Sequence, residues 1–123
     1  ETSALNIIGA EYIRDVKNRH RVVYLISGSH QILVDQIDQH LKMFFESFGT
    51  KDNLNMVGIN KVNFIKNNLN IYDFQYLGNS TKDIPIWRFC KKILYTNADQ
   101  RLQKVILTSD LEKEEIKASF KYQ

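Results

Sequence analysis

The chain has 123 residues, of which 43% are hydrophobic and 25% are charged, and its formal net charge is +3. This is the length of one domain, and seven Phe, six Tyr and one Trp exclude an intrinsically disordered chain. The single Cys excludes an internal disulfide. Short basic clusters at 17–21 and 88–92 are typical of solvated faces rather than of a nucleic-acid patch.

The first half of the chain predicts a helix, a strand and a second helix. Residues 3–17 carry apolar side chains at helical spacing, with Ser3 as a cap. The run RVVYLIS at 21–27 predicts a strand that Gly28 ends, and Ser29 offers the next cap. Residues 30–48 predict a helix that Gly49 ends. Its apolar stripe consists of Leu33, Ile37, Leu41, Phe44 and Phe48.

The apolar residues then recur at every second position, which is typical of strands. After a loop at 49–58, strands are predicted at 59–65 and 68–77, with Asn67 and Asn68 in a hairpin turn. Residues 78–83 are predicted to be a loop.

The segment 84–96 fits either a strand or a helix, and we favour the strand because the run is aromatic and β-branched. The helical alternative has Pro85 at a tolerated first-turn position. A hairpin loop at 96–100 and a strand at 101–109 are predicted next. Ser109 and Glu112 form a capping box that predicts a final helix.

These elements predict an α+β fold in which amphipathic helices pack on a curved antiparallel sheet, the nuclear-transport-factor-like architecture. If 84–96 is a helix, the order becomes β-α-β-β-α-β, which is ferredoxin-like. We expect one domain over 1–123. Because the chain opens ETSALN without Met, we expect it to be the soluble part of a longer protein.

No catalytic, cofactor-binding or metal-binding residues are predicted. His20, His30 and His40 are ten residues apart, which is not a ligand spacing. SGSHQ at 27–31 follows a strand and opens a helix, where a phosphate loop would lie, but it lacks the Lys and the Ser/Thr of that motif. Asn79 begins an NST glycosylation pattern, which we interpret as a chance match.

Three stretches resemble the periplasmic or extracellular domain of the bitopic assembly subunit of type IV secretion and conjugation channels, the TraK type. NRHRVVYLISGSHQILVD (18–35) resembles the segment after the membrane anchor in that family. QHLKMFFESFGTKD (39–52) resembles the family's H-V-K-M-F helix and the turn that follows. GINKV (58–62) is similar to its next I-N-K segment.

The resemblance implies a non-enzymatic scaffold, anchored by a segment outside this sequence on the extracytoplasmic side of a membrane; a cytoplasmic location is the alternative. It implies self-association or binding to other subunits of a membrane-associated complex, with no cofactor and no small-molecule substrate. The expected partner-binding residues are Phe45, Tyr72, Tyr76 and Trp87.

Two alternatives stay open. Tyr72, Phe74 and Tyr76 alternate like the stacking residues of an RNA-recognition module, so nucleic acid is a possible but not favoured partner. VGIN (57–60), IYDF (71–74) and IPIWR (84–88) occur in the order of the switch segments of Arf-like small GTPases, which would imply a non-hydrolysing relative. An enzyme is the least favoured class, because no nucleophile, base or metal set is visible.

Overall fold

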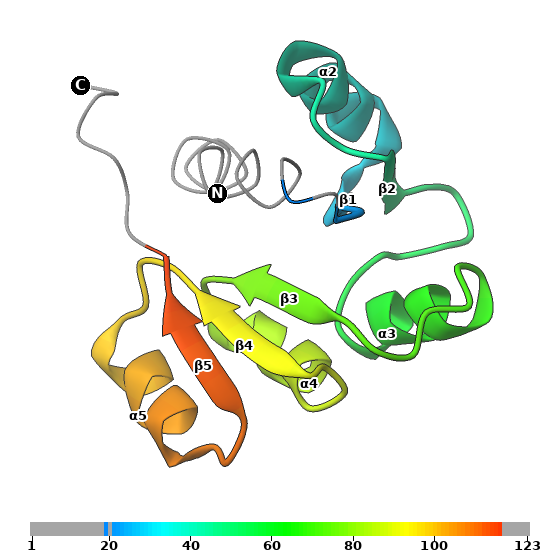
Figure 1. The fold of residues 1–123 in the computed structure, drawn as a ribbon. Helices are drawn as coiled ribbons and strands as arrows, with labels where there is room; N and C mark the ends of the chain where they lie inside the picture. Colours follow the sequence, from blue (N-terminus) through cyan, green and yellow to red (C-terminus); the bar gives the residue numbers. More distant parts are fainter. Residues whose placement is uncertain (1–18, 20, 117–123) are drawn as a thin grey trace.

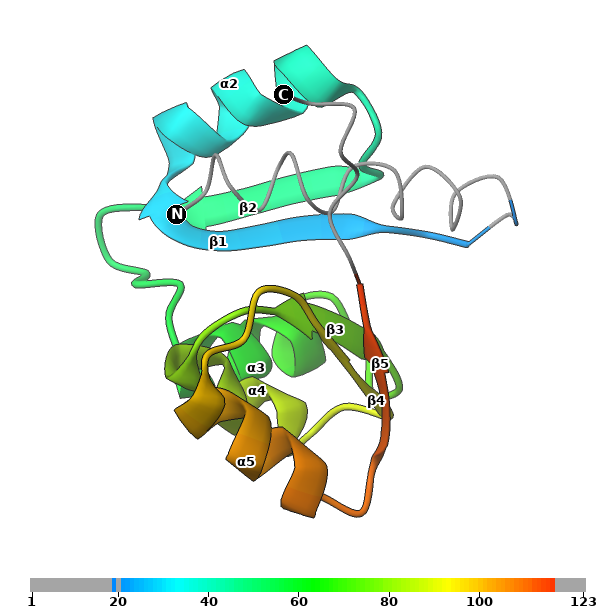
Figure 2. The same cartoon turned by 90° about the vertical axis from the view of Figure 1, so that its left-hand side faces the viewer.

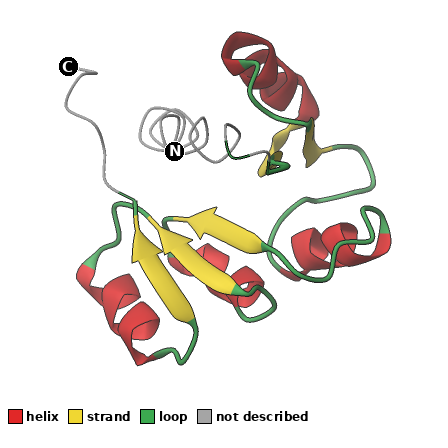
Figure 3. Cartoon of the chain, viewed as in Figure 1, coloured by secondary structure: helices red, strands yellow, loops and turns green. Residues whose placement is uncertain are grey.

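The computed structural model describes residue 19 and residues 21–116 of the chain (Figure 1). Helices and strands alternate along this part, as the colouring in Figure 3 shows. In chain order they are β1 (Tyr24–His30), α2 (Gln31–Leu41), β2 (Glu46–Thr50), α3 (Ile59–Asn67), β3 (Gln75–Gly78), η1 (Thr81–Asp83), α4 (Ile84–Trp87), β4 (Lys92–Tyr95), α5 (Gln100–Thr108) and β5 (Glu112–Glu115). The helix predicted at 3–17 lies outside the described residues.

The described strands form two sheets in which every pairing is parallel. One sheet has the order β1-β2 and the other has the order β3-β4-β5. A hairpin cannot join parallel neighbours, so a helical segment lies between each pair: α2 after β1, η1 with α4 after β3, and α5 after β4. In Figure 2 the two-stranded sheet lies above the three-stranded sheet, with α2 on its outer side.

The parallel pairing decides the fold class. The prediction that the chain mixes helices and strands in one fold is confirmed. The curved antiparallel sheet of the nuclear-transport-factor-like architecture is wrong, and so is the ferredoxin-like alternative, because both need antiparallel neighbours. The long helix predicted at 30–48 instead becomes the crossover between two parallel strands.

Helix α2 ends seven residues before the predicted end at Phe48. Its C-cap is Lys42, whose φ of 51° is left-handed and whose N–H donates to the Asp38 carbonyl. Residues 46–50 form strand β2, in which Phe48 lies opposite Ile26 of β1. A row of apolar residues is compatible with a helix and with a buried parallel strand, so the prediction failed where the helix gave way to β2.

The segment predicted as a strand at 59–65 is helix α3. Its buried residues are Lys61, Val62 and Ile65, which occupy one face at helical spacing. The polar–apolar alternation of residues 59–65 suggested a strand, but the same residues also place their apolar side chains on one face of a helix. The predicted hairpin at Asn67 and Asn68 is therefore the C-terminal end of a helix, and the strand that follows is shorter, covering only Gln75–Gly78.

The last third contains both structures that were left open for 84–96. Residues 84–87 form the short helix α4 with Pro85 in its first turn, and residues 92–95 form strand β4. The predicted strand at 101–109 is helix α5, which Asp99 caps by accepting from the Leu102 N–H. The capping box at Ser109 and Glu112 does not open a helix, because Glu112–Glu115 pair with β4 as strand β5.

The core of the three-stranded half lies between the sheet and its helices. Trp87, Cys90, Ile93, Leu102 and Ile106 form one buried cluster. Each such side chain contributes roughly 1.5–3 kcal/mol on burial, so this cluster fixes α4 and α5 against β4. Among the described helices, none has the length and hydropathy that a membrane span requires.

Candidate functional site

A cavity of about 610 Å³ lies between β1, β3 and helix α3. Gly28 near the end of β1 faces Met56 and Val57, which lead into α3. From the first turn of α3, the Lys61 side chain reaches Tyr76 on β3. The carboxyl ends of both strands therefore meet at the start of α3, and this is the usual position of ligand sites in parallel α/β folds.

Three side chains form a hydrogen-bonded chain at this end of the cavity. Lys61 Nζ donates to the Tyr76 hydroxyl at 2.9 Å. The Tyr76 hydroxyl donates in turn to Asp83 Oδ1 at 2.8 Å. All three residues line the cavity. The ammonium and the carboxylate are thus linked through a phenol rather than in direct contact.

Asp83 is held by the loop that follows β3. Its Oδ2 accepts from the N–H groups of Asn79 at 2.8 Å and Ser80 at 3.0 Å. Ser80 and Asp83 also form the capping box of η1. Gly78 allows the carboxylate to come this close, because a Cβ there would lie 2.5 Å from Asp83 Cγ.

Burial sets the protonation behaviour of this chain of groups. Lys61 is only 7% exposed. Removal from water lowers the pKa of the Lys61 ammonium, and the Asp83 carboxylate partly opposes this. Removal from water also raises the pKa of Tyr76 well above its ordinary value, with Asp83 adding to the effect. Tyr76 therefore stays a neutral phenol, and Lys61 is a poorly solvated cation that an anion would stabilise.

The end of β1 adds a hydroxyl to the same cavity. Ser27 lines the cavity, and its Oγ accepts from the Ser29 N–H at 3.1 Å. A hydroxyl that accepts one bond still has its own proton to donate. Together, Ser27 and Lys61 can offer a hydrogen-bond donor and a positive charge to an anionic group.

The carboxylates of the described residues do not form a metal centre. No group of three or more His, Cys, Asp or Glu residues in the described part of the chain could hold an ion. At the Lys61 end of the cavity, Asp83 is already engaged by two backbone N–H groups and by Tyr76. The residues present do not fit a divalent-cation cage, so we assign no step to a metal.

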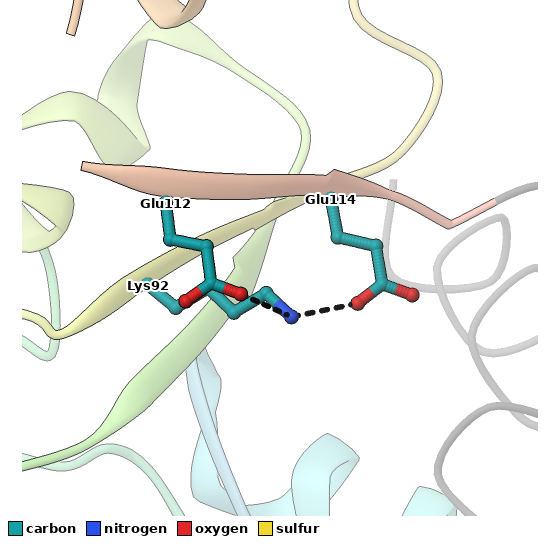
Figure 4. Close-up of polar contacts among 3 residues, drawn as sticks. All are labelled: Lys92, Glu112 and Glu114. Atoms are coloured by element: carbon teal, nitrogen blue, oxygen red, sulfur yellow. Dashed lines mark hydrogen bonds and ion pairs between the residues drawn. The ribbon is translucent and has the colours of Figure 1, made fainter. Parts of the chain in front are cut away.

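A second set of charges lies toward the amino-terminal ends of β3 and β4. Lys92 on β4 contacts Glu112 at 3.5 Å and Glu114 at 2.8 Å, both on β5 (Figure 4). The hydrogen bond from Lys92 to Glu114 is the main reason why the pKa of Lys92 is raised. Lys92 and Glu114 line the cavity, but they neutralise one another.

The four predicted partner-binding aromatics lie in different environments. Phe45 and Tyr72 are 66% and 68% exposed. Tyr76 belongs to the hydrogen-bonded chain in the cavity. Trp87 is buried, and its Nε1–H donates to the Tyr76 carbonyl at 2.9 Å. The structure does not bring the four together, and their role as partner contacts stays a prediction.

Sequence reasoning missed Lys61, Asp83 and Ser27 as a group. A usable signal was present, because two polar, glycine-containing stretches each follow an apolar run: SGSH at 27–30 and GNSTKD at 78–83. Strands that end in such stretches place them at one edge when the sheet is parallel. With β3 taken as part of an antiparallel hairpin, and α3 as a strand, no reason existed to bring these residues together.

Comparison with known proteins gives one structural likeness. The sequence matches no model of a known protein family, and no curated protein matches it. The chain is similar to a solved structure of a substrate-bound phosphoserine phosphatase complex, with 21% identity and a TM-score of 0.55. The match covers 88% of this chain and 58% of the phosphatase chain, so the chain spans little more than half of that protein's length. At this identity the likeness is one of fold.

This likeness corrects the functional predictions. The resemblance to the TraK-type assembly subunit of type IV secretion is wrong, because the comparison found a phosphatase and the sheets are parallel. The prediction of a non-enzymatic scaffold for conjugation is contradicted by the same finding, since the matched fold is that of an enzyme. The extracytoplasmic location and the predicted subunit partners stay predictions.

Proposed function

We propose that this chain is part of a phosphatase-like hydrolase and that the cavity binds the phosphate group of a phosphoric ester. The matched protein is a phosphoserine phosphatase. In this chain, charged and polar groups lie at the carboxyl ends of parallel strands, where that class of fold binds ligands.

The observation that carries the proposal is the buried ammonium of Lys61. The side chain is 7% exposed, yet it has a neutral phenol as its hydrogen-bond acceptor instead of a carboxylate. A buried cation without a directly bound counter-ion is unfavourable, and a phosphate dianion would supply one. A hydrogen bond to a charged group contributes about 1.5–3 kcal/mol, so this one contact would dominate phosphate affinity.

The neighbouring residues take binding and positioning roles. Ser27 donates its hydroxyl proton to a phosphate oxygen. Tyr76 and Asp83 are positioning residues: the Asp83 carboxylate fixes the phenol, and the phenol holds the Lys61 ammonium at the cavity. Phosphate monoesters are the substrate class that these donors suit. No described residue is assigned as the attacking nucleophile.

Lys61→Met tests the proposal, with Lys82→Met as the matched control that removes an equal charge from an exposed site. Phosphate binding is measured by titration calorimetry, and hydrolysis of phosphoserine and p-nitrophenyl phosphate by phosphate release. We expect Lys61→Met to weaken phosphate binding by about 10- to 100-fold, the equivalent of one charged hydrogen bond. Lys82→Met should leave binding unchanged.

Thermal unfolding of both variants shows whether a loss of phosphate binding is caused by unfolding of the protein. If phosphate binds the folded Lys61→Met protein as tightly as the unchanged chain, Lys61 is not the phosphate site. If the unchanged chain binds no phosphate at millimolar concentration, the proposed function itself is wrong.

A further inference from the structure

Two strand edges face the cavity from opposite sides. Among the described strands, β1 pairs only with β2, and β3 pairs only with β4. Residues 21–28, which include most of β1, and residues 73–79, which include all of β3, line the same cavity. Figure 2 shows the β1–β2 sheet and the β3–β5 sheet on either side of this region. An edge strand that lines a cavity leaves a row of backbone donors and acceptors without a ladder partner.

The two edges run in the same direction. Gly28, near the carboxyl end of β1, lies against the residues that lead into α3. Tyr76, near the carboxyl end of β3, is bonded to Lys61 in the first turn of α3. Both strands therefore point their carboxyl ends at the start of the same helix, and a strand between them can be parallel to both.

The backbone groups of β1 that face the cavity follow from its pairing. The Val23 carbonyl accepts from the Phe45 N–H at 2.7 Å, so Val23 points toward β2. Successive residues of a strand direct their N–H and C=O groups to alternate sides. Leu25 therefore also faces β2, while Tyr24 and Ile26 direct their backbone groups away from β2.

The same reasoning applies to β3. The Phe74 carbonyl accepts from the Lys91 N–H at 2.7 Å, and the Gly78 carbonyl accepts from the Thr96 N–H at 3.1 Å. Phe74, Tyr76 and Gly78 thus face β4. By alternation, Gln75 and Leu77 direct their N–H and C=O groups to the opposite edge, which is the one toward β1.

We propose that the cavity is a slot for one extended, apolar β-strand of a partner polypeptide. The strand runs parallel to β1 and β3 and joins the two sheets into one, in the order β2-β1-partner-β3-β4-β5. In that order the partner strand lies about 4.8 Å from each of its two neighbours and pairs with both edges. This inference goes beyond the phosphate proposal and stands independently of it, because it depends on backbone edges and not on Lys61.

The lining of the slot specifies the partner strand. Its middle is apolar, with Ile65, Leu69 and Leu94 among the lining residues. Charged residues lie toward both ends, with Lys61 and Asp83 at one and Asp73 and Lys92 at the other. A strand of about five or six residues with apolar side chains in its centre and polar residues at its ends matches this pattern.

Amide hydrogen exchange of the whole chain, followed by NMR, tests the slot. The probe is a synthetic peptide of about eight residues with Val and Ile in its centre and a Lys at each end. In the chain alone, we expect the slot-facing amides of Tyr24, Ile26, Gln75 and Leu77 to exchange fast. Adding the peptide should slow the exchange of these four amides by about tenfold or more. The amides of Leu25 and Tyr76 should be protected with or without peptide.

The matched control is the same peptide with methyl groups on alternate backbone nitrogens. The methyl groups remove the donors of one edge and also keep the carbonyls of that edge from approaching the slot, so the amides on one side of the slot should stay unprotected. The proposal is overturned if the plain peptide protects none of the four amides, or if the four are already as protected as Leu25 in the chain alone. Protection that rises with protein concentration without peptide would also overturn it, because a second copy would then fill the slot.

Discussion

The Lys61 ammonium donates to the Tyr76 hydroxyl at 2.9 Å, and this bond joins helix α3 to strand β3. The partners are separated by 15 residues in sequence; Lys61 is buried and Tyr76 is half-buried. The phenol passes the interaction on to Asp83. One hydroxyl thus satisfies a buried cation and a carboxylate together, so its removal affects two groups.

Tyr76→Phe should destabilise the protein. The substitution keeps the ring but leaves the Lys61 ammonium without its acceptor and Asp83 without one donor. Loss of one partner of a buried polar group costs about 1–3 kcal/mol, and we expect a decrease of this size in the free energy of unfolding in urea. The control is Tyr72→Phe, at a residue that is 68% exposed, where we expect a change within about 0.5 kcal/mol. Equal effects of the two substitutions would contradict the hydrogen-bonded chain.

Gly78→Ala should displace Asp83. The added Cβ would lie 2.5 Å from Asp83 Cγ, closer than such atoms can approach, so the carboxylate must leave the Asn79 and Ser80 N–H groups. Overpacking of this kind costs roughly 1–3 kcal/mol. The matched control is Gly28→Ala, whose Cβ would meet its nearest atom at an ordinary 3.5 Å. Denaturant unfolding of both variants checks this prediction, and no loss in Gly78→Ala would rule out the placement of Asp83.

Cys90 should be unreactive in the native protein and should make stability fall at alkaline pH. Burial raises the pKa of the thiol to about 11 from an ordinary value of 9.0. The folded state therefore keeps a proton that the unfolded state releases, so the contribution of this group to stability is present below pH 9 and is lost as pH rises toward 11. Two pKa units correspond to at most roughly 3 kcal/mol.

The test for Cys90 compares the free energy of unfolding of the unchanged chain with that of Cys90→Ala. Both are measured at several values between about pH 8 and about pH 11. The difference should shrink with rising pH. Iodoacetamide should also alkylate the native protein far more slowly than the urea-unfolded chain at mildly alkaline pH. Rapid alkylation of the native protein would show that the thiol is not buried.

Lys42→Gly tests where helix α2 ends. Lys42 has a φ of 51°, which glycine adopts without strain, so the substitution should raise the free energy of unfolding by about 0.5–1 kcal/mol. If the helix continued to Phe48, glycine at this position would instead lie inside it and lower stability by about 1 kcal/mol. The opposite signs make thermal unfolding sufficient to distinguish the two. His40→Gly, inside α2, is the control that should destabilise.

The sequence alone indicated that the chain folds and that it contains both helices and strands. The loop expected at 78–83 was wrong over most of its length, because Gly78 ends β3 and residues 81–83 form η1. The helix after His30 begins where the residues indicated, and the strand expected at 21–27 lies three residues later, at Tyr24–His30, so Gly28 does not end it. These are local features, because β-branched runs, capping residues and glycine influence the backbone conformation only within a few residues along the chain. The first turn of α4 at Pro85 was likewise a stated alternative for its segment.

Only the tertiary structure decided the strand directions, the identity of α3 and α5, and the site. Residues 59–65 alternate in polarity and also present Lys61, Val62 and Ile65 on one helical face, so their pattern fits two structures. The choice depends on what the face packs against, which is contributed by distant residues. Parallel pairing brings Ser27, Lys61 and Asp83 to one cavity although 56 positions separate the first from the last (83 − 27). No short-range pattern in the sequence predicts that these three residues line one cavity, because they come together only when the ends of β1 and β3 lie beside the same helix.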